Sequence, residues 1–370
     1  MSSTNKYNLP AYPPPAGVTA QIGHAPNGNT TTVAIITLCL ALTSIAVALR
    51  VYSRFFVLCK VQLQDYLMLL SFTIYIAFLG IYLRLVHYPG WFVHLWDLTW
   101  GEFIEFLRLG IISTSVFLAF YVAIKTAILL EWLSLFLPDG GDRRSLFYWS
   151  CHIILWANVL FCTSELILVN LACTPIEYSW DRTIEGYCRI ETGKTSLSAA
   201  VFAFVTDVII FFIPQRIIWT LNMTWRRKLG VSVVFALGLA ACTASIVRLY
   251  YTVQRNVSYD LSYHLSRVQL TAVGEGAAAL LVFCIPAAPK AVAAIKQSQL
   301  VLPLPSWSSL VSVIRRRASQ GSLDSKSPDA GSSPFAPSGE KHKVSSDRWQ
   351  AGSGSVEPSG TLGAITQRRV

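Results

Sequence analysis

Seven long runs of apolar residues dominate the first 294 positions of the chain, and short polar connections separate them. Each run is about eighteen or more residues long, so as an α-helix rising 1.5 Å per residue it could cross roughly 30 Å of hydrocarbon. The pattern therefore predicts an all-α bundle of seven transmembrane helices. The predicted spans are residues 32–51, 66–83, 109–130, 146–171, 197–221, 229–251 and 268–294.

The connection after the fourth run is polar and acidic, and a cysteine stands at each end of it, Cys173 and Cys188. Because both lie in one loop on the expected oxidising side of the membrane, we predict a disulfide between them. The other cysteines lie in or beside apolar runs, where a small buried thiol is the usual role. No spacing resembles a zinc site, so we expect no metal. These cysteines are Cys39, Cys59, Cys151, Cys162, Cys242 and Cys284.

Basic residues gather in alternate connections, and this asymmetry predicts the orientation of the bundle. By the positive-inside rule, the side with more Lys and Arg is the cytoplasm. The first, third and fifth connections and the segment after the seventh run are the basic ones, which places the N-terminus outside and the C-terminus in the cytoplasm. Their basic residues are Arg50, Arg54, Lys60, Arg143, Arg144, Arg216, Arg226, Arg227, Lys228, Lys290, Lys296 and residues 315–317.

The composition of the chain agrees with lipid as its solvent. Hydrophobic residues make up 53% and charged residues 14%, against roughly 45–50% and 25% in soluble domains. A net charge of +10 would suggest nucleic acid as the partner of a soluble protein, but here the basic residues serve as orientation signals. We therefore expect the bilayer as partner and no nucleic acid. The plasma membrane is favoured over an internal membrane.

Two tails flank the predicted membrane domain, residues 32–294. Residues 1–31 are predicted to be a flexible extracellular tail, and residues 295–370, rich in Ser, Pro and Gly, a disordered cytoplasmic tail. Residues 306–317 have apolar positions at helical spacing followed by three arginines, which suits either a basic amphipathic segment on the inner leaflet or a disordered tract with chance spacing. Ser319 is a candidate phosphorylation site beside these arginines.

Five charged residues lie inside the predicted spans: Lys125, Glu165, Asp207, Arg248 and Glu275. Such residues usually face a cavity or a partner because a charge in hydrocarbon is costly. Lys125 is close enough to the inner end of its helix to extend toward water. Asp207 lies roughly 15 Å below the outer surface and should face the bundle interior. For Glu165 the sequence suggests no partner.

Arg248 and Glu275 have similar depth on helices joined by a short connection, which predicts an ion pair. The pair could hold the two helices in register, or it could bind a polar group of a ligand. We take Asp207, Arg248 and Glu275 as candidate ligand-binding residues, and Asn256, in the sequence Asn-Val-Ser on a predicted outer loop, as a candidate glycosylation site.

The chain resembles the fungal rhodopsin-domain family of seven-helix membrane proteins between about residues 34 and 294. The matching positions follow the family order along the spans and connections. They are Arg50, Arg54, Asp65, Gly90, His94, Lys125, Ile128, Leu129, Cys173, Pro175, Trp180, Asp181, Gly186, Cys188, Thr206, Asp207, Pro214, Leu221, Lys228, Gly238, Ser245, Arg248, Glu275 and Pro286.

This resemblance implies a receptor of the G-protein-coupled type, with a heterotrimeric G protein as a partner. The chain departs from the family at Ala127, Ala203 and Ala277, and Ser134 stands where the family has an arginine at the inner end of the third helix. If that arginine takes part in signalling, this chain lacks a residue that coupling to a G protein requires.

We therefore predict a receptor-like protein that senses a small molecule or peptide from the outer face. No cofactor is expected: the seventh run has no mid-membrane lysine for a retinal Schiff base, because Lys290 falls at its inner end. No soluble-enzyme motif is present, and no catalytic residue is assigned. A membrane-embedded cyclase or isomerase using Asp207 or Glu275 as its acid stays an alternative, as does a transporter, although no internal repeat is evident.

Overall fold

The computed structural model describes residues 7–137, 146–218 and 225–285, without the side chains of residues 214–231 and 234. The chain divides into two units, residues 1–302 and 303–370, and all described residues belong to the first. The predicted disordered tail, the amphipathic segment 306–317, Ser319, Pro286 and Lys290 lie outside the described residues.

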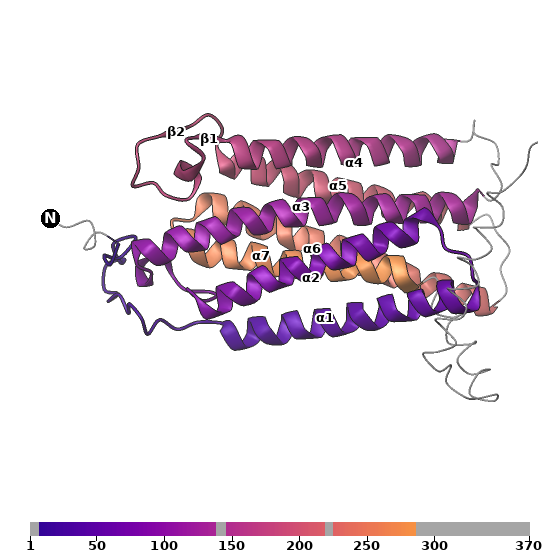
Figure 1. Ribbon diagram of the computed structural model, residues 1–370, viewed down its shortest axis with the longest axis horizontal. Coiled ribbons are helices and arrows are strands. Elements are labelled where there is room, and N and C mark those ends of the chain that lie inside the picture. The colour runs from indigo at the N-terminus through magenta and orange to yellow at the C-terminus, as the bar shows by residue number, and fades with distance from the viewer. Residues whose placement is uncertain (1–6, 138–145, 219–224, 286–370) are drawn as a thin grey trace, which may run out of the picture. The chain divides into compact units, whose positions relative to one another are not determined.

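Seven helices that are long and apolar enough to cross a membrane run through the described residues, as predicted. Figure 1 shows them side by side along one common direction. They are α1 (Asn29–Val51), α2 (Leu63–His87), α3 (Trp100–Phe136), α4 (Leu146–Leu171), α5 (Thr192–Ile218), α6 (Trp225–Val257) and α7 (Leu261–Cys284).

Two helices begin well before their predicted limits. α3 starts at Trp100, because Thr99 caps it: the Thr99 hydroxyl accepts from Glu102 N (3.3 Å) and the Glu102 carboxylate accepts from Thr99 N (2.8 Å). This capping box stabilises a polar first turn, which apolar length alone does not reveal. α7 starts at Leu261, directly after Asp260. At the opposite end of the bundle, α1 continues as a π-helix, η2 (Tyr52–Val57).

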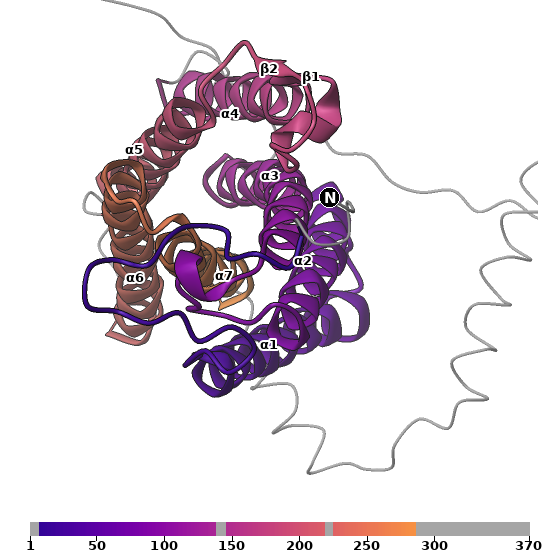
Figure 2. The ribbon, with the colours of Figure 1, turned by 90° about the vertical axis from the view of Figure 1, so that its left-hand side faces the viewer.

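The hydrophobic core lies where α2, α3 and α7 meet. Figure 2, viewed along the helices, shows α3 and α7 toward the centre of the arrangement. Tyr75 of α2 packs on Phe120 of α3 with ring centroids 5.4 Å apart, and its hydroxyl donates to the Val273 carbonyl of α7 (2.9 Å). Gly276 allows this close approach, because a Cβ there would lie 2.8 Å from the Tyr75 ring.

A short hairpin lies beside the end of α4. Its strands, β1 (Cys173–Thr174) and β2 (Tyr187–Cys188), pair antiparallel with Cys173 opposite Cys188, and the 3-10 helix η5 (Ile176–Ser179) lies between them. The predicted disulfide joins the two cysteines. It closes the polar loop into a compact structure (Figure 1).

The N-terminal segment packs against the connection between α2 and α3, which contains the 3-10 helix η3 (Leu95–Asp97). Ala11 N donates to the Leu98 carbonyl (2.8 Å), and Gln21 N donates to the Asp97 carboxylate (2.8 Å). Flexibility of residues 1–31 stays a prediction, but Ala11 and Gln21 are hydrogen-bonded to the α2–α3 connection, and residues 29–31 already belong to α1.

Candidate functional site

Lys125 of α3 and Asp207 of α5 form an ion pair inside the bundle. Lys125 Nζ lies 2.9 Å from Asp207 Oδ1, and the lysine side chain is 2% exposed. The ammonium also donates to the Thr206 hydroxyl (2.5 Å) and lies 4.1 Å from the centre of the Tyr121 ring. The expectation that Lys125 extends toward water is therefore wrong: three polar or aromatic partners hold it in the interior.

Arg248 of α6 and Glu275 of α7 form the predicted ion pair. Arg248 Nε lies 2.6 Å from Glu275 Oε2, and their side chains are 12% and 2% exposed. The contact is close without the alignment of a hydrogen bond, since both atoms lack one. The guanidinium also lies 5.4 Å from the centre of the Phe117 ring of α3. Burial makes this pair sensitive to the loss of either charge.

Two hydroxyl groups connect the pairs into one network. The Tyr121 hydroxyl lies 2.9 Å from Glu275 Oε1 and 3.1 Å from Asp207 Oδ2. The Ser245 hydroxyl also contacts both carboxylates, donating to Asp207 Oδ2 and lying 3.3 Å from Glu275 Oε1. Each hydroxyl has one hydrogen, so it can serve only one carboxylate at a time. The network can therefore adopt alternative hydrogen-bond patterns with little movement of its atoms.

This central network comprises Tyr121, Lys125, Asp207, Ser245, Arg248 and Glu275, and it joins α3, α5, α6 and α7. Two positive and two negative side chains balance in formal charge. In the low dielectric of the interior, a charged or hydrogen-bonding group placed here would compete strongly for these partners. The arrangement can bind a polar ligand group, and its two carboxylates are the groups that could take up a proton.

The sequence indicated three of these residues as ligand-binding candidates, and the structure places all three in this network. The sequence analysis did not single out Tyr121. A signal was present, because Tyr121 precedes Lys125 by four residues and shares its helix face. Ser245 appeared only as a family position, although it precedes Arg248 by three residues.

A second buried network lies at the other end of the bundle. Arg50 of α1, with no exposed surface, contacts Asp65 of α2 (2.9 Å) and Glu131 of α3 (2.8 Å), and it donates to the Phe283 carbonyl of α7 (2.9 Å). Arg54 of η2 contacts Glu131 as well (2.8 Å). The two arginines thus do more than signal orientation, and Glu131 is a partner that sequence reasoning missed.

The remaining candidates lie apart from the central network. Glu165 of α4 is 4% exposed and accepts from the Ser198 hydroxyl of α5 (2.8 Å). Asn256 is exposed in the last turn of α6, and its amide nitrogen donates to the Gly193 carbonyl (3.1 Å). Glycosylation at Asn256 stays a prediction.

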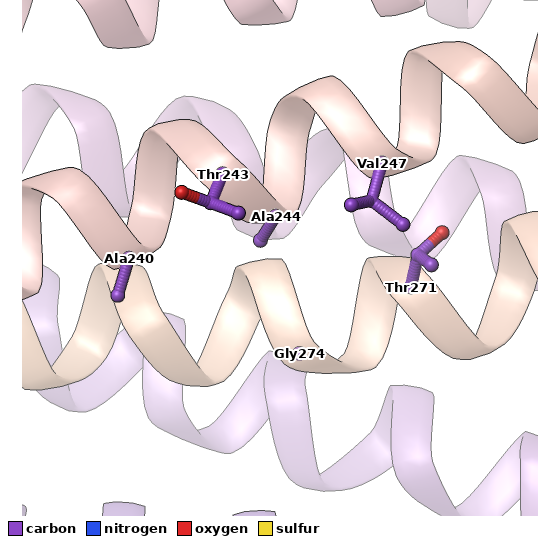
Figure 3. Close-up of a pocket in the computed structure, with 6 residues that line it drawn as sticks. All are labelled: Ala240, Thr243, Ala244, Val247, Thr271 and Gly274. Carbon is purple, nitrogen blue, oxygen red and sulfur yellow. The ribbon is translucent and has the colours of Figure 1, made fainter.

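A cavity of about 420 Å³ lies between α6 and α7. Figure 3 shows its lining residues, which include Ala244, Val247, Thr271 and Gly274. Three of the lining residues immediately precede Ser245, Arg248 and Glu275 in the chain. The threonine hydroxyls of the lining donate to carbonyls of their own helices, so the cavity is apolar and separate from the network.

Comparison with known proteins gives one family and several relatives. The family described as "Fungal rhodopsin domain" matches residues 49–294. "Fugralins biosynthesis cluster protein 2" of Gibberella zeae is 33% identical over 282 residues, which cover 76% of this chain and 70% of that protein.

Two further relatives match over shorter stretches. A "SAT4 family membrane protein" of Emericella nidulans is 30% identical over 50% of this chain and 46% of its own length. "Receptor GIN3" of Arthrobotrys oligospora is 24% identical over 56% of this chain and 49% of its own length. No solved structure matches.

Proposed function

Because this chain belongs to the fungal rhodopsin domain family, we propose that it is a receptor-like membrane protein that binds a small molecule or peptide from the outer face. Asp207, Arg248 and Glu275 contact the ligand. The observation that carries this proposal is the buried central network, which joins α3, α5, α6 and α7 through ion pairs of 2.9 and 2.6 Å. A relative of this chain is named as a receptor.

Ligand binding acts on the bundle through partner exchange. A ligand carboxylate would compete with Glu275 for Arg248, and a ligand cation would compete with Arg248 for Glu275. Either exchange frees one side chain of α6 or α7 to change partners, which shifts the relative positions of these helices. A change of this kind is what a G protein on the cytoplasmic side would detect, and that partner belongs to the same proposal.

The test measures thermal unfolding of the full-length purified protein in nanodiscs, in the presence of each compound of a library of charged fungal metabolites and short peptides. A ligand of this site raises Tm in the wild-type protein. In the charge-balanced variant Arg248→Gln/Glu275→Gln the shift disappears, because the two side chains with which the charged ligand group exchanges partners have lost their charges.

The matched control is Arg108→Gln/Glu105→Gln. This pair is separated by 3.9 Å, and its side chains are 58% and 30% exposed, so its loss changes the same two charges away from the network. The control keeps the ligand-induced shift. A ligand whose effect survives the Arg248/Glu275 change would contradict the proposed site.

A second function has support of a different kind. The relative with 33% identity is named as a protein of a biosynthesis cluster, which favours a membrane-embedded enzyme that uses Glu275 and Tyr121 in proton transfer. Under this alternative, Glu275→Gln would abolish conversion of a substrate while binding persists. Under the receptor proposal, the bound ligand is recovered chemically unchanged from the wild-type protein, as mass spectrometry would show.

A further inference from the structure

An apolar pocket lies along one face of α5 near the hairpin, and its end at the start of α5 is polar. Its volume is about 480 Å³, and Lys194, Leu197, Ser198, Val201, Phe202 and Val205 line it. Val201 and Val205 are 44% and 45% exposed, so the pocket opens on the lipid-facing surface. Volumes of about 300–1,000 Å³ are typical of small-molecule sites.

The polarity of the lining changes along the helix. Lys194 lies in the first turn of α5, with a side chain 79% exposed and paired with Glu191 (3.0 Å). Ser198 follows one turn deeper, and Val201, Phe202 and Val205 continue toward the membrane centre. This change from polar to apolar side chains matches a molecule inserted in one leaflet, with its polar head at the interface and its chain in the hydrocarbon.

Glu165 supplies a buried acceptor beside the polar end. It is 4% exposed, and among the described residues Ser198 is its only hydrogen-bond donor. The Ser198 hydroxyl also lies 2.8 Å from the Thr195 carbonyl, and its single hydrogen cannot serve both acceptors at once. The other oxygen, Oε2, accepts no hydrogen bond from the described residues, so the carboxyl group can accept a further hydrogen bond from a ligand.

We propose that this pocket binds a single-chain membrane amphiphile whose head carries a hydroxyl group. The head donates a hydrogen bond to Glu165 beside Ser198, and the chain lies along Val201 and Val205. Stacking of Phe202 on Phe161 of α4, with ring centroids 3.9 Å apart, holds α4 and α5 together so that Glu165 stays next to the pocket. This site is separate from the central network and does not depend on the function proposed for it.

The test is photolabelling of the full-length protein in phosphatidylcholine nanodiscs with a diazirine-bearing long-chain alcohol and its methyl ether. The alcohol labels residues 194–205 about tenfold more than the ether, because the ether cannot donate to Glu165. Glu165→Leu removes this preference, because leucine has no oxygen that could accept the hydrogen bond. Val201→Trp fills the pocket and abolishes labelling of the segment by both probes.

The matched control is Ile167→Trp, which adds the same bulk at a lipid-facing position of α4 that is 53% exposed. It leaves the labelling unchanged. Each variant is first checked for a monodisperse elution profile and an intact Cys173–Cys188 bridge. Equal labelling by alcohol and ether in the wild-type protein, or full labelling of folded Val201→Trp, would overturn the proposal.

Discussion

Lys125 shows how strongly a single buried charge depends on its partner. Replacing Lys125 by Met leaves Asp207 without its cation. We expect the free energy of unfolding to fall by about 3–5 kcal/mol, the usual result of removing one partner of a buried ion pair. The double variant Lys125→Met/Asp207→Asn should recover most of this loss, because no unpaired charge remains. Thermal unfolding of the purified variants would measure both.

Arg108→Met/Glu105→Gln provides the comparison, since this exposed pair should contribute no more than about 1 kcal/mol. If the double Lys125/Asp207 variant were as unstable as Lys125→Met alone, the charge would not be the cause, and lost packing would explain the result instead.

At the scale of elements, substitutions at two glycines of α7 distinguish the effect of close helix packing from the effect of helix propensity. A Cβ at Gly276 would lie 2.8 Å from Tyr75 and 3.2 Å from Phe120, whereas a Cβ at Gly274 meets nothing within 4 Å. Gly276→Ala should destabilise the bundle by ~1–3 kcal/mol through overpacking between α7, α2 and α3. Gly274→Ala should stabilise it by up to ~1 kcal/mol, because alanine favours the helix.

Unfolding of both variants under identical detergent conditions checks the two signs. The contrast is informative because the substitutions are identical and only two positions apart. Equal effects at the two positions would mean that the spacing of α7 from α2 and α3 does not depend on Gly276.

For the whole molecule, the proposed orientation can be tested with a cysteine that the chain already contains. Cys59 is a free, exposed thiol at the end proposed to be cytoplasmic, and Tyr259, 86% exposed, lies in the connection proposed to be extracellular. In intact cells a membrane-impermeant maleimide should label Tyr259→Cys and should label Cys59 only after permeabilisation. Cys59→Ser identifies the Cys59 signal by removing it.

Labelling of Cys59 but not of position 259 in intact cells would reverse the orientation. If neither site reacted before permeabilisation, the plasma membrane would be excluded as the place of residence.

The sequence by itself determined the number of spans, the position of α4 and the disulfide. A span is recognised from the length of one apolar run, which is a local property that the bilayer thickness sets. Cys173 and Cys188 share one loop, and Arg248 and Glu275 lie on helices joined by a short connection, so their proximity also follows from chain order. Helix starts were less accurate, since Thr99 and Asp260 begin their helices with polar turns.

Only the tertiary structure decided which distant residues meet. Lys125 and Asp207 lie on α3 and α5, Arg50 contacts helices α2, α3 and α7, and Glu165 finds Ser198 across the α4 and α5 interface. These pairings depend on the rotation and depth of each helix in the bundle. Packing of side chains such as Tyr75 against Gly276 sets that rotation, whereas the sequence of a single apolar run does not specify which helices pack against it.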